Sequence, residues 1–330
     1  MSAFKAYRIH TEADGVKAGF ENLTVDQLTA GEVVIRVEYS GINYKDALAA
    51  TGAGKILRTS PLVGGVDLAG RVVSSTDARF AAGAAVLVTG CGLSETLDGG
   101  YAEYARVPAD AVVPMPPGLD ARSAMAVGTA GFAAALGIHK MEQNGLKPGG
   151  LPVLVTGASG GVGSLAIDML TARGYEAVAV SGKPAADDYL ASLGAVKILR
   201  SGEFDLGKRP LERALWSGAV DNVGGEVLAW LTRTGDVNGS IASIGLAGGA
   251  DLKTTVMPFI LRGINILGVN SAATVREKRL ALWQRIATDL KPRHVERIVT
   301  KEIPFDALPG AFEDYIKSRI IGRTLIRIGA

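Results

Sequence analysis

The stretch that decides the fold is Val153-Leu154-Val155-Thr156-Gly157-Ala158-Ser159-Gly160-Gly161-Val162-Gly163, where an apolar strand-like run enters a glycine-rich turn. A helix-like segment follows at 162–173, and residues 177–180 form a second strand-like run. In this order of elements the glycines let the backbone approach a pyrophosphate, and the helix N-terminus presents free N–H groups to it. We therefore predict a dinucleotide site whose cofactor-binding residues include Ser159, Gly160, Gly161 and Val162.

Two other interpretations of this turn have to be weighed. The fit to G-x-G-x-x-G is imperfect, because Ala158 stands where the first glycine would be. The turn also matches T-G-x-x-x-G-x-G of short-chain dehydrogenases, but it lies in mid-chain and no tyrosine has a lysine four residues later. The other interpretation is a glycine-rich turn that binds no ligand, which the flanking strand and helix disfavour.

The end of the second strand predicts which dinucleotide is bound. An acidic residue about 20 positions past the glycines would bind the ribose 2′-hydroxyl and select NAD. This chain has Ser181, Gly182 and Lys183 there, and a hydroxyl and an ammonium suit a 2′-phosphate that a carboxylate would repel. We therefore predict NADPH. Arg200 either adds charge at the same phosphate or is a solvated surface residue.

The pattern outward from the turn predicts an α/β protein with two domains. Strand-like runs at 32–39, 63–74 and 84–89 precede a group of prolines between 108 and 117, and strands and helices then alternate up to 264–269. Such alternation predicts parallel βαβ units. We expect a Rossmann domain with a doubly wound parallel sheet over 124–296 and a mainly β domain over 1–123 and 297–330. The strand-like run at 323–328 is expected to return to the β domain.

Composition bounds the partners and the cellular setting. The 330 residues carry a net charge of only +2, which disfavours nucleic acid or a membrane surface as a partner. The single cysteine, Cys91, excludes an intrachain disulfide. The first residues lack the apolar segment of a signal peptide, and no uninterrupted apolar stretch approaches the roughly 20 residues of a membrane span. We expect a cytoplasmic enzyme.

Further segments carry a family resemblance that covers nearly the whole chain. They are SGINYKDAL at 40–48, GGVDLAG at 64–70, GTAGF at 128–132, VMPFILR at 256–262 and GRT at 322–324. With the turn and Ser181-Gly182-Lys183, they make the chain similar to the medium-chain dehydrogenase/reductase superfamily. Within its quinone-oxidoreductase branch, the chain resembles the acrylyl-CoA reductase group, also known as the YhdH/YhfP or AcuI-like type. The resemblance implies that the β domain is a GroES-like catalytic domain.

The resemblance also implies an enzyme without zinc. Zinc-dependent members bind metal through a cysteine, a Gly-His-Glu segment and further cysteines. In this chain Asn43-Tyr44-Lys45-Asp46 occupies the first of these regions and Gly65-Val66-Asp67 the second. With a single cysteine no four-cysteine site can form, and His10, His139 and His294 are not spaced as a ligand cluster. We expect no metal.

The implied reaction is NADPH-dependent reduction of acrylyl-CoA to propanoyl-CoA. Negative charge grows on the thioester oxygen in such a reaction, so the site needs a hydrogen-bond donor and a proton source. Tyr44 either donates to that oxygen, or merely packs against the nicotinamide or caps the pocket. Asn43 and Asp46 complete the predicted catalytic set, although they also suit a purely structural role in the loop. Asp67, inside an apolar run, is expected to be a buried and hydrogen-bonded residue.

The superfamily pattern adds contacts for the rest of the cofactor and substrate. It places Tyr44, Thr129, Leu246, Ile260, Ser271 and Ser318 among the cofactor-binding residues. Lys45, Arg262 and Arg323 are either partners of CoA phosphates or surface ion pairs. The rivals to an acrylyl-CoA reductase are a broad-specificity quinone or enone reductase and a non-catalytic NADPH-binding sensor. A homodimer is expected, because the apolar strand at 264–269 needs cover.

Overall fold

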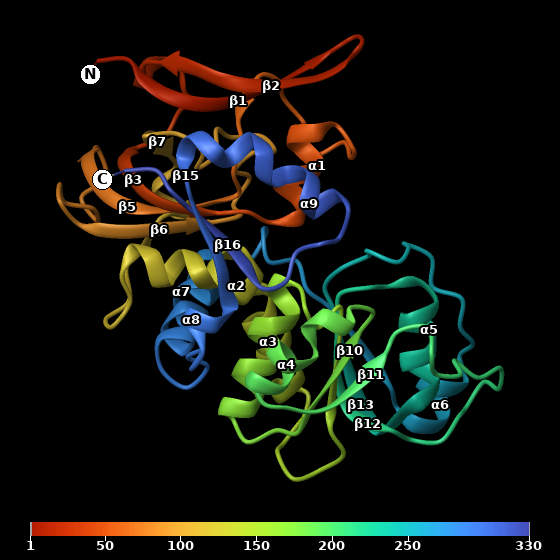
Figure 1. Cartoon of the computed structure of the whole chain (residues 1–330). Helices are drawn as coiled ribbons and strands as arrows, with labels where there is room; N and C mark the ends of the chain where they lie inside the picture. The colour runs from red at the N-terminus through yellow and green to blue at the C-terminus, as the bar shows by residue number, and fades with distance from the viewer. Residues whose placement is uncertain (1, 330) are drawn as a thin grey trace. The chain divides into compact units, whose positions relative to one another are not determined.

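The computed structural model describes residues 2–329, which form two compact units (Figure 1). Unit 1 comprises Met1–Thr129, Ser271–Ala287 and Val299–Ala330, and unit 2 comprises Ala130–Asn270 and Thr288–Ile298. Residues 271–287 therefore pack with unit 1, whereas the sequence placed them in the Rossmann range. The limits at 123 and 297 remain predictions of the domain boundaries.

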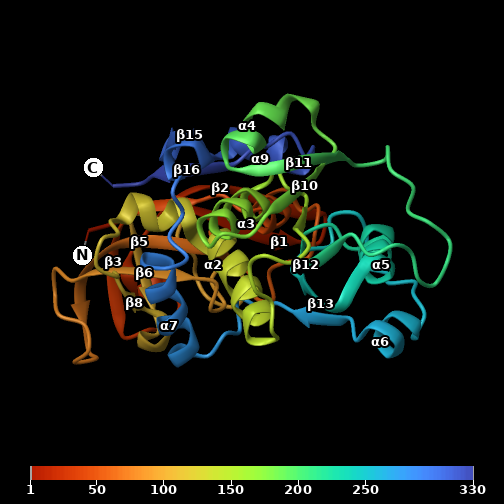
Figure 2. The same ribbon diagram turned by 90° about the horizontal axis from the view of Figure 1, so that it is seen from below.

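Unit 2 is built around a six-stranded parallel sheet in the order β11-β10-β9-β12-β13-β14. Figure 2 labels four of its strands, β10, β11, β12 and β13. This is the strand order of the doubly wound nucleotide-binding fold. From the first strand, β9, the chain first adds strands on one side and then returns to add the rest on the other side. The strands are β9 (Val153–Thr156), β10 (Ala177–Ser181), β11 (Ala195–Arg200), β12 (Trp216–Asp221), β13 (Gly235–Ser243) and β14 (Asn265–Gly268). The helices are α3 (Gly161–Ala172), α4 (Asp187–Ser192), α5 (Gly225–Thr234), α6 (Met257–Arg262) and α8 (Val295–Ile298). The predicted Rossmann sheet is confirmed.

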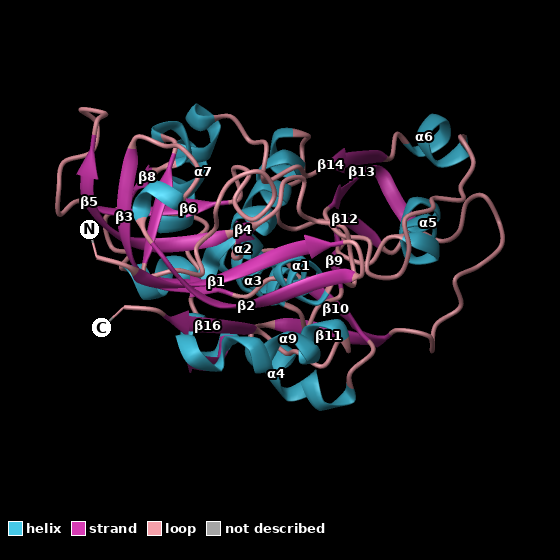
Figure 3. Ribbon diagram, turned by 90° about the horizontal axis from the view of Figure 1, so that it is seen from above, coloured by secondary structure: helices cyan, strands magenta, loops and turns pink. Residues whose placement is uncertain are grey.

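Unit 1 is mainly β. A seven-stranded sheet has the order β15-β16-β3-β5-β6-β8, with β7 also paired to β3, and a three-stranded sheet has the order β2-β1-β4 (Figure 3). The larger sheet contains β3 (Val33–Gly41), β5 (Asp67–Ser75), β6 (Ala85–Thr89), β7 (Tyr104–Val107), β8 (Val113–Pro114), β15 (Val299–Pro304) and β16 (Arg323–Arg327). The smaller contains β1 (Phe4–Glu12), β2 (Gly15–Leu23) and β4 (Leu62–Val63). The helices α1 (Tyr44–Thr51), α7 (Arg276–Ala287) and α9 (Phe312–Ile316) complete this unit.

The C-terminal strand returns to unit 1 as the sequence predicted. Three residues of β16, Leu325, Ile326 and Arg327, pair antiparallel with Gly41, Ser40 and Tyr39 of β3. The strand also pairs in parallel with β15. Leu325 and Ile326 are fully buried, so the pairing brings apolar side chains into the core together with the backbone hydrogen bonds.

The helix α2 (Ala121–Gln143) meets the length and hydropathy of a membrane span, which the sequence analysis did not expect. However, 78% of its most apolar window is buried inside the structure. Its composition is therefore that of a core helix. The helix is interrupted at Gly128, whose φ of 52° and ψ of −158° are not helical, so that a new helical segment begins at Thr129.

Candidate active site and cofactor site

The glycine-rich turn of unit 2 leaves the N-terminus of α3 open. Gly157, at the end of β9, has a φ of 57°, and Gly160 is the N-cap of α3 without any side-chain capping bond. The first N–H groups of a helix have no partner within it, so those of Gly161 and Val162 are available to an anion. A Cβ on Gly160 would meet only the carbonyl oxygen of Gly157, at 3.4 Å, which leaves room for a ligand over this residue.

Gly163 has a different task in the same turn. A Cβ at this position would lie 2.5 Å from the carbonyl oxygen of Gly157 and 2.6 Å from the Cα of Ala158. Gly163 therefore lets α3 pack directly against the turn, and Gly160 lets a ligand approach it. These are two of the separate roles that the fold gives to its glycines.

A polar network that the sequence analysis missed holds the carboxyl ends of β9 and β12 together. The Thr156 hydroxyl donates to the buried Asp221 carboxylate at 2.7 Å, and the Asn222 amide group donates to the Thr156 carbonyl oxygen at 2.8 Å. Asp221 also accepts from the backbone N–H groups of Val223 and Gly224. Burial raises the pKa of Asp221. The network fixes the sheet edge from which the turn projects; its only sequence signals are a Thr and an Asp at strand ends.

Ser181, Lys183 and Arg200 come together at the carboxyl ends of β10 and β11. Ser181 and Arg200 are register partners, the Lys183 N–H donates to the Ser181 hydroxyl oxygen at 3.2 Å, and an Arg200 N–H donates to the Ser181 carbonyl oxygen at 3.4 Å. Arg200 also pairs with Asp187, 2.6 Å away, at the first residue of α4. Partial burial lowers the pKa of Lys183. The side chains of Ser181, Lys183 and Arg200 are a hydroxyl and two cations, a set that favours an anion such as a 2′-phosphate.

The two apolar cofactor residues predicted in unit 2 lie in different places. Leu246 follows the carboxyl end of β13 and is 67% exposed, as a residue lining a ligand site at that edge would be. Ile260 is 73% exposed on α6, the helix that leads into the amino end of β14. The structure therefore brings Leu246, but not Ile260, to the sheet edge that carries the turn.

In unit 1, Asn43 and Asp46 form a capping box around the first turn of α1. The Asn43 N–H donates to Asp46 Oδ2 at 2.8 Å, and Asp46 Oδ1 accepts from the Val66 N–H at 2.9 Å. Burial and the nearby Asp67 raise the pKa of Asp46 to about 7. The neighbouring Tyr44 is the first residue of α1 and is 48% exposed, and its hydroxyl makes no hydrogen bond within residues 2–329. The box thus fixes the backbone on which Tyr44 is presented.

Asp67 is fully buried and joins the loop of Tyr44 to the second half of α2. Its carboxylate accepts from the Thr129 N–H at 3.0 Å, from the Thr129 hydroxyl at 2.6 Å and from the Asn43 amide at 2.8 Å. It thereby caps the helical segment that begins at Thr129. Gly128 permits this approach, because a Cβ there would lie 2.7 Å from Asp67 Oδ2. The expectation of a buried, satisfied Asp67 is confirmed.

Arg323 is a structural residue, so its assignment as a CoA-phosphate partner or surface ion pair is wrong. It is 2% exposed, and its guanidinium donates to the carbonyl oxygens of Ile42, Met125 and Ala126 and to Asn43 Oδ1. It also lies 3.7 Å from the Asp67 carboxylate. We call Asn43, Asp46, Asp67, Thr129 and Arg323 the buried polar network.

The remaining predicted residues have separate positions. Arg262 donates to the backbone carbonyl oxygens of Arg233, Gly235 and Glu212, so it is neither a free phosphate partner nor half of a surface ion pair. Lys45 is half of an ion pair with Glu95. The Ser271 carbonyl oxygen accepts from Arg279, and Ser318 follows α9 with a φ of 53°. Within residues 2–329, neither serine bonds to the buried polar network.

Both units contain segments that match known protein families. Residues 29–117 match the alcohol dehydrogenase GroES-like domain family, and residues 161–288 match the zinc-binding dehydrogenase family. Among similar proteins, the acrylyl-CoA reductase AcuI of Ruegeria pomeroyi is 45% identical over 97% of both chains. The putative quinone oxidoreductase YhfP of Bacillus subtilis is 45% identical over 98% of this chain and 99% of its own.

Solved structures show the same relationship. The Escherichia coli protein YhdH with bound NADPH superposes with a TM-score of 0.94 at 45% identity, over 98% of this chain and all of its own. The structure of Bacillus subtilis YhfP with bound NAD gives a TM-score of 0.96 at 44% identity, over 99% of this chain and all of its own. The chain therefore belongs to the medium-chain dehydrogenase/reductase family, in the quinone-oxidoreductase group that includes YhfP and AcuI.

Proposed function

We propose that this protein is an NADPH-dependent, zinc-independent reductase that converts acrylyl-CoA to propanoyl-CoA. The observation that carries the proposal is the cluster of Ser181, Lys183 and Arg200 at the ends of β10 and β11, in a chain 45% identical to an acrylyl-CoA reductase. This cluster suits the 2′-phosphate that distinguishes NADPH from NADH. The family favours hydride transfer as the reaction, and the relative named acrylyl-CoA reductase favours a thioester as the substrate.

The residues of unit 2 fit NADPH. The open N–H groups of Gly161 and Val162 suit its pyrophosphate, and the bare backbone of Gly160 leaves room for it. When bound, NADPH supplies a hydride, which an acrylyl thioester accepts at its β-carbon. Leu246 offers an exposed apolar side chain at the same sheet edge.

Tyr44 is proposed as the donor to the thioester oxygen. Its hydroxyl is exposed and unpaired within residues 2–329, so it is free to donate to a substrate atom. Tyr44 is also the first residue of α1, and the positive end of a helix dipole stabilises the charge that develops on an enolate oxygen. Asn43 and Asp46 act as positioning residues in this scheme, because their capping box holds the turn that carries Tyr44.

Thr129 is proposed to orient the nicotinamide carboxamide as an acceptor. Its hydroxyl hydrogen is already donated to Asp67, at 2.6 Å, and its N–H points to the same carboxylate. Only the lone pairs of the hydroxyl oxygen remain, and these accept from the NH₂ group of a carboxamide. The buried polar network thereby sets the direction of the Thr129 hydroxyl. Ile260, Ser271 and Ser318 remain proposed cofactor contacts.

The test is NADPH oxidation with acrylyl-CoA, crotonyl-CoA and a simple quinone, measured side by side. The proposal predicts the highest kcat/KM for acrylyl-CoA, and a loss of about 10²-fold or more in kcat in Tyr44→Phe, because a single oxyanion donor is removed. Turnover confined to the quinone would refute it. Unchanged kcat in Tyr44→Phe would assign Tyr44 to packing alone.

Two other functions remain in view. The name of YhfP favours a quinone or enone reductase of broad specificity, which the same substrate comparison tests. A non-catalytic sensor would bind NADPH tightly and oxidise it with none of the three acceptors.

A homodimer is proposed from the edge of the unit 2 sheet. Among residues 2–329, the edge strand β14 pairs with β13 alone, and its residues Ile266 and Leu267 are half-buried. An apolar edge of this kind is covered in a stable protein, and a second copy of the chain provides such cover. Light scattering at micromolar concentration is expected to give twice the chain mass, and a monomer mass would refute the dimer.

A cytoplasmic location accords with the single, free Cys91.

A further inference from the structure

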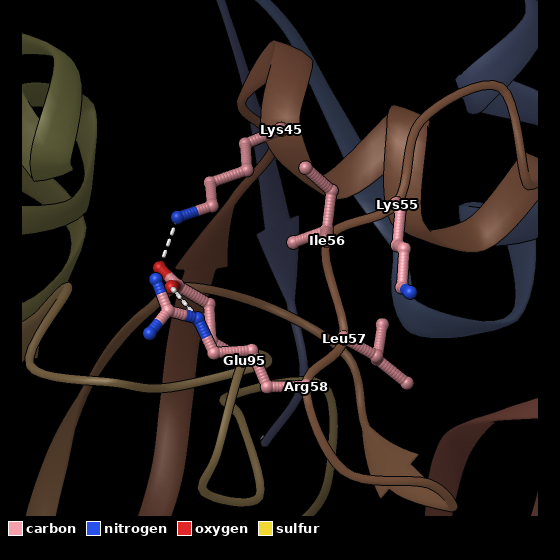
Figure 4. Close-up of a pocket in the computed structure, with 6 residues that line it drawn as sticks. All are labelled: Lys45, Lys55, Ile56, Leu57, Arg58 and Glu95. Carbon is pink, nitrogen blue, oxygen red and sulfur yellow. Dashed lines mark hydrogen bonds and ion pairs between the residues drawn. The ribbon is translucent and has the colours of Figure 1, made fainter.

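A groove of about 520 Å³ lies on the surface of unit 1 next to α1 (Figure 4). It is lined by Lys45, Lys55, Ile56, Leu57, Arg58 and Glu95. Figure 4 shows Lys45, Arg58 and Glu95 meeting on one side of the groove, with Lys55 on the other side of Ile56. Five of the six residues come from α1 and the segment that follows it, and Glu95 comes from the loop after β6.

The walls of this groove are fixed to each other. The backbone N–H groups of Arg58 and Thr59 both donate to the Glu95 carbonyl oxygen, at 2.7 and 3.4 Å. The Lys45 ammonium forms an ion pair with the Glu95 carboxylate across the same junction. Ile56 and Leu57 pack against the core cluster between the two sheets of unit 1. A ligand therefore meets a preformed site, which reduces the entropy lost on binding.

The charge in the groove is unbalanced. Three cations face one carboxylate, and Glu95 is engaged by Lys45 and lies 4.0 Å from Arg58. Lys55 is exposed and forms no ion pair or hydrogen bond within residues 2–329, and the Arg58 side chain is 76% exposed. The two half-buried apolar side chains, Ile56 and Leu57, lie between these cations in sequence. Such a surface favours a ligand that combines phosphate groups with a long uncharged chain.

The groove also lies next to the residue proposed as the donor to the thioester oxygen. Lys45 directly follows Tyr44 on α1, so the groove opens beside the helix turn that carries the proposed donor to the thioester oxygen. We propose that it binds the CoA portion of the substrate, with Lys55 and Arg58 paired to phosphate groups and the pantetheine chain over Ile56 and Leu57. The inference rests on the proposed function, since a CoA thioester places phosphates at the end of such a chain.

The experiment compares two thioesters in the double variant Lys55→Ala/Arg58→Ala. Acrylyl-CoA carries the phosphates, and acrylyl-N-acetylcysteamine has the same reacting group without them. We expect the KM for acrylyl-CoA to rise about tenfold at low salt, with kcat unchanged, because two partly exposed charge pairs are lost. The KM for acrylyl-N-acetylcysteamine should not change. The control Lys147→Ala/Arg213→Ala removes the same charge from exposed residues of unit 2.

The outcomes separate this inference from the proposed function. An unchanged KM for acrylyl-CoA, or an equal rise for both thioesters, would overturn the groove assignment while the reductase activity stands. If the wild-type protein reduced neither thioester, the proposed function would fail. Equilibrium binding of CoA then tests the groove assignment independently of turnover. Tighter binding of CoA to the wild type than to the double variant would support the assignment, and equal or absent binding would overturn it.

Discussion

Replacing Asp67 with Asn should destabilise unit 1 strongly, because this buried carboxylate lies beside the Arg323 guanidinium and accepts hydrogen bonds from Asn43 and Thr129. Asp67 is fully buried and Arg323 is 2% exposed, with 3.7 Å between them. The substitution keeps the shape of the side chain, removes its charge and turns an NH₂ group toward groups that are themselves donors.

The magnitude follows from these contacts. Breaking a buried ion pair costs about 3–5 kcal/mol, because the remaining charge stays buried without compensation. Arg323 keeps its bonds to the carbonyl oxygens of Ile42, Met125 and Ala126. We therefore expect a loss near the lower limit, about 3 kcal/mol in the free energy of unfolding. This is a large part of the 5–15 kcal/mol that is typical of folded proteins.

The assay is urea unfolding, with hydrogen exchange of peptides from unit 1 to assign the transition to that unit. Asp110→Asn is the matched control, because its side chain is 80% exposed in a surface pair with Arg79. The control should change the free energy of unfolding by less than about 1 kcal/mol. If Asp67→Asn were as mild as Asp110→Asn, the buried polar network would not stabilise unit 1 as we argue.

Three further predictions concern the cofactor site and pH. Lys183→Ala should raise the KM for NADPH about tenfold and leave the KM for NADH unchanged, since only NADPH carries the 2′-phosphate. Steady-state kinetics with both cofactors test this, and an equal rise in both KM values would contradict it. Gly163→Ala should lower the thermal unfolding midpoint, because its Cβ would lie 2.5 Å from a backbone oxygen. Gly160→Ala should instead weaken NADPH binding and leave the unfolding midpoint unchanged. Calorimetry and NADPH titration of both variants test this difference, and equal effects of the two substitutions would contradict it. Burial raises the pKa of Asp46 to about 7 from 3.8. Between these values the folded form holds a proton that the unfolded chain has released, so the Asp46 contribution to stability falls as pH rises from 3.8 to about 7. Urea midpoints at pH 5 and 7.5 should show this fall in wild type, and an equal fall in Asp46→Asn would refute it.

The sequence predicted the nucleotide-binding unit because its signals are local. A buried strand, a glycine-rich turn and a helix follow one another within residues 153–173, and each is encoded by its own residues. The edge strand β11 was missed, since Val196 and Lys197 are exposed and the strand has no apolar run. An edge strand of this kind is specified by its partner β10 more than by its own composition.

Long-range contacts of arginines explain most of what could not be predicted. Arg279 is 1% exposed and donates to the carbonyl oxygens of Thr89 and Ser271, and Arg276 donates to the carbonyl oxygen of Val112. These bonds join residues 271–287 to unit 1. Arg323 and Arg262 likewise each donate to three backbone carbonyl oxygens. Nothing in the sequence distinguishes such arginines from phosphate ligands, because their acceptors come from distant segments.

The most direct test of the central claim follows the hydrogen atoms of the reaction. Acrylyl-CoA is incubated with the protein and NADPH deuterated at the transferable position of the nicotinamide, and the product is examined by NMR. We predict propanoyl-CoA with deuterium at the β-carbon, and deuterium at the α-carbon when unlabelled NADPH is used in D₂O. Consumption of the labelled NADPH with a quinone, with no deuterium entering the thioester, would contradict the account.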